Sequence, residues 1–339
     1  MNSKERMTAV LSGKHPDRSP VSMNLALYGA GLTGCPLVEY YSDPEAYALG
    51  QEQVSRIFQP DILFAPFAMP LYAQSFGGTL RFYKDQPPNI KKPVLSVPDD
   101  FHLLALPDPD NNPSLVYMRR AIRIMGSRHG NEVVVAGVAM DPVSLPIMLM
   151  GLDKWLQTFL FEETMATDIL GWILPFFREW VNILFEEGAS FVALPMAFTT
   201  PAILPRKLVL ERCMPVLKQA FDGVKGPLIL HSTGAPFSPF IDLFATLPNV
   251  KGAELNCKDS FQDTRANVGE QLLLMGNLEG PNCNQWSVKQ TREKCKTILQ
   301  DRKDDPFFIL GTSGPDIPID TPPAIIHAIG RSVEDVNKW

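Results

Sequence analysis

The chain has 339 residues, a formal net charge of −6 and a hydrophobic fraction of 45%, which is typical of a globular protein with a large core. Acidic and basic residues are interspersed and no basic block occurs, so a nucleic-acid partner is not expected. The N-terminus lacks an apolar signal core and no apolar stretch reaches the roughly 20 residues that cross a bilayer, which predicts a cytoplasmic protein without membrane association.

The N-terminal half of the chain mixes helices with three apolar runs. A first helix is predicted over residues 2–12, where Asn2 and Glu5 form a capping pair. Pro44 lies in the first turn of another predicted helix, which ends near Phe58. The other elements expected in this half are strands at 20–25, 61–67 and 132–140, a hairpin-like insertion at 77–100, and helices at 114–127, 152–161 and 166–187.

The last of these helices has the clearest periodicity in the sequence. Apolar residues recur there every three to four positions, at Ile169, Ile173, Phe176, Trp180 and Ile183. This spacing predicts one buried helix face.

The C-terminal half alternates regularly between strand and helix. Strands are predicted at 190–196, 227–230, 250–255, 271–277 and 307–310, with helices at 208–221, 239–245, 262–268, 287–300 and 323–332. Few polar residues alternate within the strands, as expected for parallel strands covered on both faces.

Together the eight predicted strands indicate an α/β fold, the (β/α)8 TIM barrel. We expect a single domain over residues 1–339, with a helical N-terminal extension at 1–19 and the hairpin-like insertion at 77–100. A doubly wound open sheet is the alternative, and it is disfavoured because no G-x-G-x-x-G motif follows the first strand.

In such a barrel the functional site lies at the C-terminal ends of the strands. The first polar residues after the apolar runs are Asn24, Asp141, His231, Glu254 with Asn256 and Cys257, Asn277 with Glu279, and finally Thr312, Ser313 and Asp316. Singly, an Asp or Asn at such a position is more often a helix N-cap or a turn former.

His231 and Glu254 are the strongest candidates, because they end neighbouring predicted strands about 4.8 Å apart. Their side chains are expected to converge on one ion or substrate atom, although His231 as a merely hydrogen-bonded rim histidine remains the alternative. The other four histidines are expected at the surface: His15, His102, His129 and His327.

Apolar residues near the strand ends are candidates for a pocket that holds an aromatic or alkyl substrate. Ordinary packing at the barrel rim explains them equally well. The candidates are Phe67, Met69, Met140, Met196 and Phe198, with Asn24 and Ser313 as polar substrate contacts.

Five segments of the chain resemble, in order and spacing, the uroporphyrinogen decarboxylase-like superfamily on its methyltransferase branch. They are NSKERMTAVLSGKHPDRSPV, GASFVALP, LILHSTG, LLLMGNLEGP and DIPIDTPPAIIHAIG, which together extend over essentially the whole chain. The resemblance implies a (β/α)8 barrel. It also implies methyl transfer to or from the cobalt of a corrinoid carried on a separate small protein. True decarboxylases of the superfamily carry an arginine pair near the first strand, and SMNLALYGAG has none, which disfavours porphyrinogen decarboxylation.

The resemblance also raises the question of zinc. Thiol-methylating members hold zinc with a His-x-Cys pair after the fifth strand and a cysteine after the eighth. Here His231 is retained, but the paired position is Thr233 and the last position falls near Pro315. Either zinc is lost, or it is held by a harder set such as His231, Glu254 and Cys257 or another carboxylate. The five cysteines are scattered and lack C-x-x-C spacing, which argues against disulfides and a zinc ribbon.

Fewer thiolates would make a bound zinc ion a stronger Lewis acid, suited to polarising an ether oxygen or an amine. The predicted function is therefore methyl transfer from a small O-methyl or N-methyl substrate to the cobalt(I) corrinoid of a partner protein. His231 and Glu254 would contact the metal or the leaving group, and Asp141 and Asn277 would position the substrate. The alternatives are transfer from methylcobamide to a thiol or folate, or a non-catalytic barrel that binds a tetrapyrrole or a corrinoid protein. Pairing into a homodimer through outer helices is a further expectation.

Overall fold

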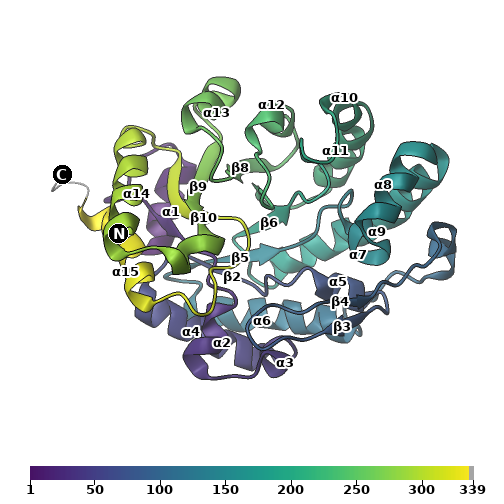
Figure 1. Cartoon of the computed structure of the whole chain (residues 1–339), viewed down its shortest axis with the longest axis horizontal. Helices are drawn as coiled ribbons and strands as arrows, with labels where there is room; N and C mark the ends of the chain where they lie inside the picture. The colour runs from purple at the N-terminus through teal and green to yellow at the C-terminus, as the bar shows by residue number, and fades with distance from the viewer. Residues whose placement is uncertain (336–339) are drawn as a thin grey trace.

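The computed structural model describes residues 1–335, whose centre is an eight-stranded parallel sheet ringed by helices (Figure 1). The sheet order is β1-β10-β9-β8-β7-β6-β5-β2. The strands are β1 Val21–Ser22, β2 Ile62–Phe64, β5 Val134–Val138, β6 Phe191–Pro195, β7 Leu228–His231, β8 Val250–Glu254, β9 Leu273–Glu279 and β10 Phe308–Ser313. These are the eight predicted strands, and β9 and β10 continue two and three residues beyond their predicted ends.

The two outer strands of this order, β1 and β2, meet and bring the sheet close to full closure. The N–H of Asp61, just before β2, donates to the Val21 carbonyl at 2.9 Å, and the Val21 N–H donates to Asp61 Oδ2 at 2.8 Å. An open doubly wound sheet would leave both outer strands as edges. The prediction of a (β/α)8 TIM barrel is therefore confirmed.

Helices follow the strands and cover the outside of the barrel. The α-helices are α1 Ser3–Leu11, α2 Tyr28–Thr33, α3 Leu37–Tyr40, α4 Pro44–Phe58, α5 Pro70–Ser75, α6 Pro113–His129, α7 Leu145–Met150, α8 Leu152–Phe161, α9 Glu163–Glu186, α10 Arg206–Leu208, α11 Met214–Asp222, α12 Ile241–Phe244, α13 Phe261–Val268, α14 Val288–Asp301 and α15 Pro323–Asp335. Short 3₁₀ helices lie at η1 Pro98–Leu103, η3 Ser238–Phe240 and η4 Gly280–Gln285, and one π-helical turn at η2 Val209–Cys213. None of the helices within residues 1–335 is both long and apolar enough to span a membrane.

Local sequence signals set several helix starts. Asn2 and Glu5 form the predicted capping box of α1. Asp43 caps α4 ahead of Pro44, which needs no N–H partner in the first turn. The predicted hairpin is also present, with β3 Thr79–Arg81 paired antiparallel to β4 Asn89–Lys92.

Helix α9 buries the predicted stripe over most of its length. Ile169, Ile173, Phe176 and Trp180 are all buried, while Leu184 takes the inward position in place of the half-buried Ile183. The Trp180 indole N–H donates to the Tyr72 hydroxyl at 2.7 Å, so this large side chain is buried with its polar atom satisfied.

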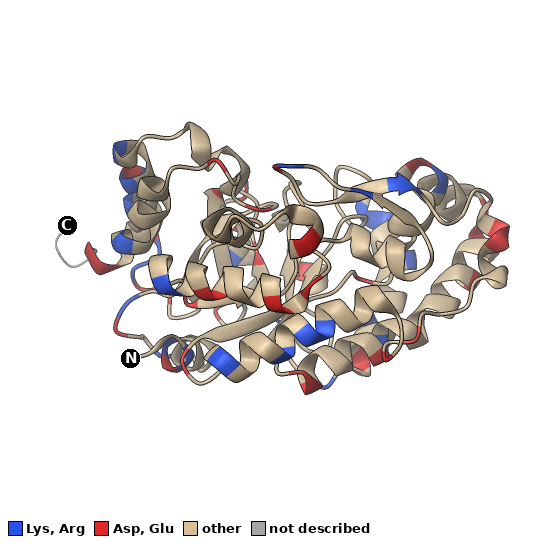
Figure 2. Cartoon of the chain, turned by 90° about the horizontal axis from the view of Figure 1, so that it is seen from below, with Lys and Arg blue, Asp and Glu red and all other residues tan. Residues whose placement is uncertain are grey.

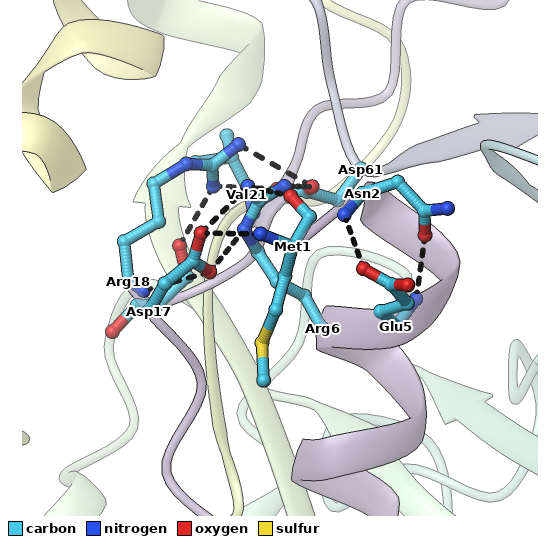
Figure 3. Close-up of polar contacts among 9 residues, drawn as sticks. Met1, Asn2, Glu5, Arg6, Asp17, Arg18, Val21 and Asp61 are labelled. Atoms are coloured by element: carbon cyan, nitrogen blue, oxygen red, sulfur yellow. Dashed lines mark hydrogen bonds and ion pairs between the residues drawn. The ribbon is translucent and has the colours of Figure 1, made fainter.

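Helix α1 is tied to the N-terminal end of the barrel by ion pairs around Asp61 (Figure 3). The Asp61 side chain is fully buried and receives Arg6 Nη1 at 2.9 Å and Arg18 Nη1 at 2.7 Å. Arg6 also donates to the half-exposed Asp17 at 2.6 Å. Because Asp61 additionally accepts the Val21 N–H, this cluster fixes the N-terminal extension to the β1–β2 junction.

Charged side chains lie mainly on the outer helices and loops. Figure 2 shows Lys and Arg interspersed with Asp and Glu along the helices seen from that side. Among residues 1–335 no lysine or arginine is buried. Asp61 and Glu187 are buried but contact partly exposed arginines, whereas other buried carboxyl groups lie at the opposite end of the barrel.

Candidate functional site at the C-terminal end of the barrel

His231 and Glu254 are the last residues of the neighbouring strands β7 and β8, and they are partners in the strand register. Residues at matching positions on adjacent strands point to the same side of the sheet, so the register itself brings the two side chains together. His231 Nε2 lies 3.1 Å from Glu254 Oε2, and both side chains are almost completely buried. The expected convergence of these two groups is therefore present.

Glu254 is held from a second side as well. Its Oε1 accepts the backbone N–H of Gly314, after β10, at 3.2 Å. Burial raises the pKa of the Glu254 carboxyl, and the neighbouring His231 opposes that rise. Glu254 thus links β7, β8 and the segment after β10 at one point.

The His231 ring packs against Phe67, which follows β2, with a centroid separation of 5.0 Å. Nε2 is paired with Glu254 by the 3.1 Å contact, whereas within the described chain Nδ1 has no hydrogen-bond partner. The alternative of a hydrogen-bonded rim histidine stays open through the contact with Glu254. The Nδ1 side of the buried ring is available for proton transfer or for a ligand.

Asp316 is a further carboxyl group of this site, to which sequence reasoning assigned no role. It lies after β10, its Oδ1 accepts the Leu27 N–H at 2.8 Å, and burial raises its pKa to about 7. The charge of His231 opposes this rise, which indicates that the two groups interact. Its position as a polar residue just past the last apolar run was the available signal.

Asp141 follows β5, and its two carboxylate oxygens differ in their contacts. Its Oδ1 accepts the N–H groups of Val143 and Ser144, as expected of a turn former. Its Oδ2 is buried without a hydrogen-bond partner, and burial raises the pKa of the carboxyl to about 6. A substrate-positioning role for Asp141 stays a prediction.

The two predicted asparagines are both at the strand ends but differ in their contacts. Asn277 donates through Nδ2 to the carbonyls of Asn256 and Asp259, at 3.0 and 2.9 Å, and so supports the segment after β8. Asn24 is buried, and its Nδ2 has no partner in the described chain. Ser313 donates to the Leu278 carbonyl at 3.2 Å. Asn24 is therefore the more available of these three groups for a substrate.

The predicted apolar lining divides between the rim and the core. Phe198 is fully buried against Trp155 and Phe159 of α8, with ring separations of 5.7 and 5.1 Å, and so serves as a core residue in this structure. Met140 and Met196 are also buried. The half-buried Met69 starts α5 near Phe67. Substrate contact by these side chains remains a prediction.

The residues present do not assemble the predicted zinc site. No group of three His, Cys, Asp or Glu side chains within residues 1–335 is arranged to hold a metal ion. Cys257 is half-buried, its Sγ contacts Asn256 Oδ1 at 3.7 Å, and it forms no such group with His231 and Glu254. Thr233 and Pro315 are exposed. A catalytic zinc site uses three protein ligands, and this arrangement supplies two donors.

The remaining histidines differ in burial. His15 and His102 are exposed, as predicted. His129 and His327 are half-buried, and the His327 ring packs 5.0 Å from that of Phe58. The prediction of surface positions is therefore too simple for these two.

A surface cavity of about 590 Å³ lies elsewhere, between the α2–α4 region and α6. Its lining includes Cys35, Glu39, Asp43 and Arg128, and it shares no residue with the His231–Glu254 pair. Burial raises the pKa of the Cys35 thiol, which lowers its nucleophilic character. The barrel end therefore remains the better candidate for chemistry.

Comparisons with known proteins agree with this architecture. The model of the family described as uroporphyrinogen decarboxylase (URO-D) matches residues 2–336. A methylcobamide:CoM methyltransferase MtbA of Methanosarcina acetivorans is 22% identical, over 87% of this chain and 88% of that protein. A uroporphyrinogen decarboxylase of Hydrogenovibrio crunogenus is 26% identical, over 71% and 67%.

Among solved structures, a methyltransferase from Methanosarcina mazei superposes with a TM-score of 0.89 at 18% identity and covers 99% of both chains. A B12-independent methionine synthase from Shewanella sp. W3-18-1 gives a TM-score of 0.58 at 11% identity, over 87% and 88%. At these identities the structural likeness establishes a shared fold.

Proposed function

The chain belongs to the uroporphyrinogen decarboxylase (URO-D) family, and from this membership we propose that it is a corrinoid-dependent methyltransferase. It takes the methyl group of a small O-methyl or N-methyl compound and passes it to the cobalt(I) corrinoid of a partner protein. Support comes from the relatives named methylcobamide:CoM methyltransferases, which match over more than four fifths of this chain. Porphyrinogen decarboxylation is disfavoured because the segment after β1, residues 23–27, carries no arginine.

The observation that carries the proposed direction of transfer is the buried His231–Glu254 pair without a thiolate beside it. A methyl ether is unreactive because its alkoxide or phenolate is a poor leaving group. A proton delivered to the ether oxygen as the C–O bond breaks lowers that barrier, and such general-acid assistance contributes about 10²- to 10⁴-fold in rate.

In this mechanism Glu254 orients the imidazole of His231 through the 3.1 Å contact between Oε2 and the ring Nε2. The C–O bonding pair passes to the leaving oxygen, which takes a proton from His231. Both electrons of the new bond to the methyl carbon come from the co-substrate, the cobalt(I) of the partner's corrinoid. His231 then regains a proton from solvent, and no step passes through zinc.

A second candidate is transfer from methylcobamide to a thiol, which the names of the relatives favour. A thiol acceptor must be activated as a thiolate, usually by metal coordination. The two-donor arrangement of His231 and Glu254 is less suited to that task than to protonation of a leaving group.

One assay separates the two directions. The purified chain is mixed with a reduced corrinoid protein and a panel of methoxylated and N-methylated compounds, and methyl-cobalt formation is followed by its visible spectrum. The reverse reaction starts from methyl-cobalt and thiols. We expect methyl-cobalt from at least one donor and a loss of about 100-fold or more in His231→Ala.

The matched control is His15→Ala, because His15 is exposed in the N-terminal extension. This variant should retain the rate of the unaltered chain. Methyl-cobalt consumption with thiols, and none formed from any donor, would replace the proposed direction by the second candidate.

A further inference from the structure

The C-terminal end of the barrel has an unusual balance of charge. It includes the residues that directly follow the strands, at 23–27, 65–69, 139–144, 196–205, 232–237, 255–260, 280–287 and 314–322. We refer to this end as the barrel mouth. These eight short segments contain four aspartates and one basic residue, the exposed Lys258, while the longer connection from β2 to α6 adds four exposed basic residues, Arg81, Lys84, Lys91 and Lys92. Glu254 and Glu279 at the ends of β8 and β9 add two more carboxyl groups.

The carboxyl groups of the barrel mouth differ in the number of hydrogen bonds that they accept. Asp259 accepts N–H groups from Phe237, Ser238 and Asn256, so its charge is stabilised by the backbone. Asp141 has one buried oxygen without a hydrogen bond, and Asp316 accepts a single N–H from the segment after β1. Within the described chain these two carboxyl groups form no ion pair with a lysine or arginine.

Polar atoms that lack partners gather at the same end. Four such atoms are buried without a hydrogen bond: His231 Nδ1, Asn24 Nδ2, Asp141 Oδ2 and Ser232 Oγ. They come from the ends of β1, β5 and β7. Buried polar atoms normally have partners, so this concentration indicates that a polar ligand completes them.

We propose that the methyl donor bound at this mouth carries no anionic group and is a neutral or cationic methyl ether. This inference rests on the proposed function and adds the charge class of the substrate. An anionic ligand would enter a site that contains several carboxyl groups and no buried lysine or arginine among residues 1–335, and a protonated His231 already faces Glu254 at 3.1 Å. A buried charge without a partner is strongly unfavourable.

Protonation of some of the carboxyl groups would reduce the repulsion of an anion, but it would not supply a buried lysine or arginine as a partner. A cationic group, in contrast, compensates an ionised carboxylate, and a neutral hydroxyl satisfies the unpartnered atoms without a charge penalty. Methoxylated carboxylates are therefore predicted to be poor substrates.

The experiment compares three compounds of similar shape that share one methyl ether: 4-methoxybenzylamine, 4-methoxybenzyl alcohol and 4-methoxybenzoate. Two like charges several ångströms apart in a partly solvated site weaken binding by on the order of 30-fold. We therefore expect kcat/KM for methyl-cobalt formation to be at least about 30-fold lower with the benzoate than with the alcohol, and the amine to equal or exceed the alcohol.

Substitution of one acid tests the cause. Asp141→Asn should reduce the ratio of kcat/KM for the alcohol to kcat/KM for the benzoate several-fold. The substitution removes one ionisable group and keeps an oxygen for the Val143 and Ser144 N–H groups. The matched control is Asp304→Asn, since Asp304 is 90% exposed in the loop before β10 at the opposite end of the barrel. Asp304→Asn should leave this kcat/KM ratio unchanged.

The outcomes separate this inference from the proposed function. If the benzoate is transferred as well as the alcohol, the charge inference is wrong while the methyltransferase proposal stands. If no compound yields methyl-cobalt, the proposed function fails, and direct calorimetric binding of the same three compounds decides the charge inference. Tighter binding of the amine and alcohol than of the benzoate supports it. Equal binding, preference for the benzoate, or no binding of any of the three overturns it.

Discussion

Replacement of Asp141 by asparagine should change how the stability of the protein depends on pH. Burial raises the pKa of Asp141 from its ordinary value near 3.8 to about 6. A group whose pKa is higher in the folded state stabilises the fold while it is protonated, and that contribution is lost as the pH rises from about 4 through 6. At about 1.4 kcal/mol per pH unit, the full loss is about 3 kcal/mol, of which about 2 kcal/mol falls between pH 4 and pH 7.5.

An asparagine side chain cannot ionise, so Asp141→Asn removes this dependence. Between pH 4 and pH 7.5 the free energy of unfolding should therefore fall by about 2 kcal/mol more in the unaltered chain than in the variant. This difference does not depend on which of the two is more stable at either pH. A change of 1 kcal/mol moves the thermal midpoint of a large domain by about 2 °C. The midpoint of the variant minus that of the unaltered chain should therefore be about 4 °C higher at pH 7.5 than at pH 4. Midpoints followed by tryptophan fluorescence at a series of pH values measure this, with Asp304→Asn as an exposed control. A difference between variant and unaltered chain that stays constant with pH would refute the reasoning.

Three other outcomes are expected. Zinc added to the chelator-treated chain should bind no more tightly than to the His231→Ala variant, as measured by calorimetry, because the described residues gather two donors; zinc binding that depends on His231 would contradict this. Asp61→Ala should destabilise the fold by about 3–5 kcal/mol, because it leaves two arginines without their buried partner, whereas Asp17→Ala, at a half-exposed position, should cost less than about 1 kcal/mol in the same denaturation assay. Phe198→Ala should cost about 3–5 kcal/mol through loss of packing against α8, and a change in substrate preference without such a loss would favour the predicted role in substrate binding.

The barrel was predictable because its signals are local and repeated. Eight apolar runs of four to nine residues, separated by helical segments, leave few alternatives to a barrel. The short elements were missed for a physical reason. Helices such as α2, α5 and α7 have only six residues each, too few for a periodic pattern, and their conformation depends on packing against the barrel.

The His231–Glu254 pair could be predicted because strand order and strand ends together determine it. Contacts between loops could not be predicted in this way. The Gly314 N–H on Glu254 and the Leu27 N–H on Asp316 join segments 60 and 289 residues apart, and no local pattern indicates them. Asn277 illustrates the same limit, because its amide is used to support a neighbouring loop.

Among the described residues no third metal donor is gathered beside His231 and Glu254, and two sequence positions explain this. The family resemblance places sulfur ligands near Thr233 and Pro315, and both residues are exposed in the structure, where they supply no donor to the buried imidazole. Glu254 meanwhile remains fixed by the strand register and by Gly314, so the imidazole keeps an anionic neighbour but no thiolate. With a carboxyl group at 3.1 Å and no third donor gathered among the described residues, the proposed role of the imidazole is to transfer a proton rather than to share a metal ion. The carboxyl groups around His231 underlie both the proposed proton transfer and the proposed charge preference, so the two proposals have one electrostatic origin.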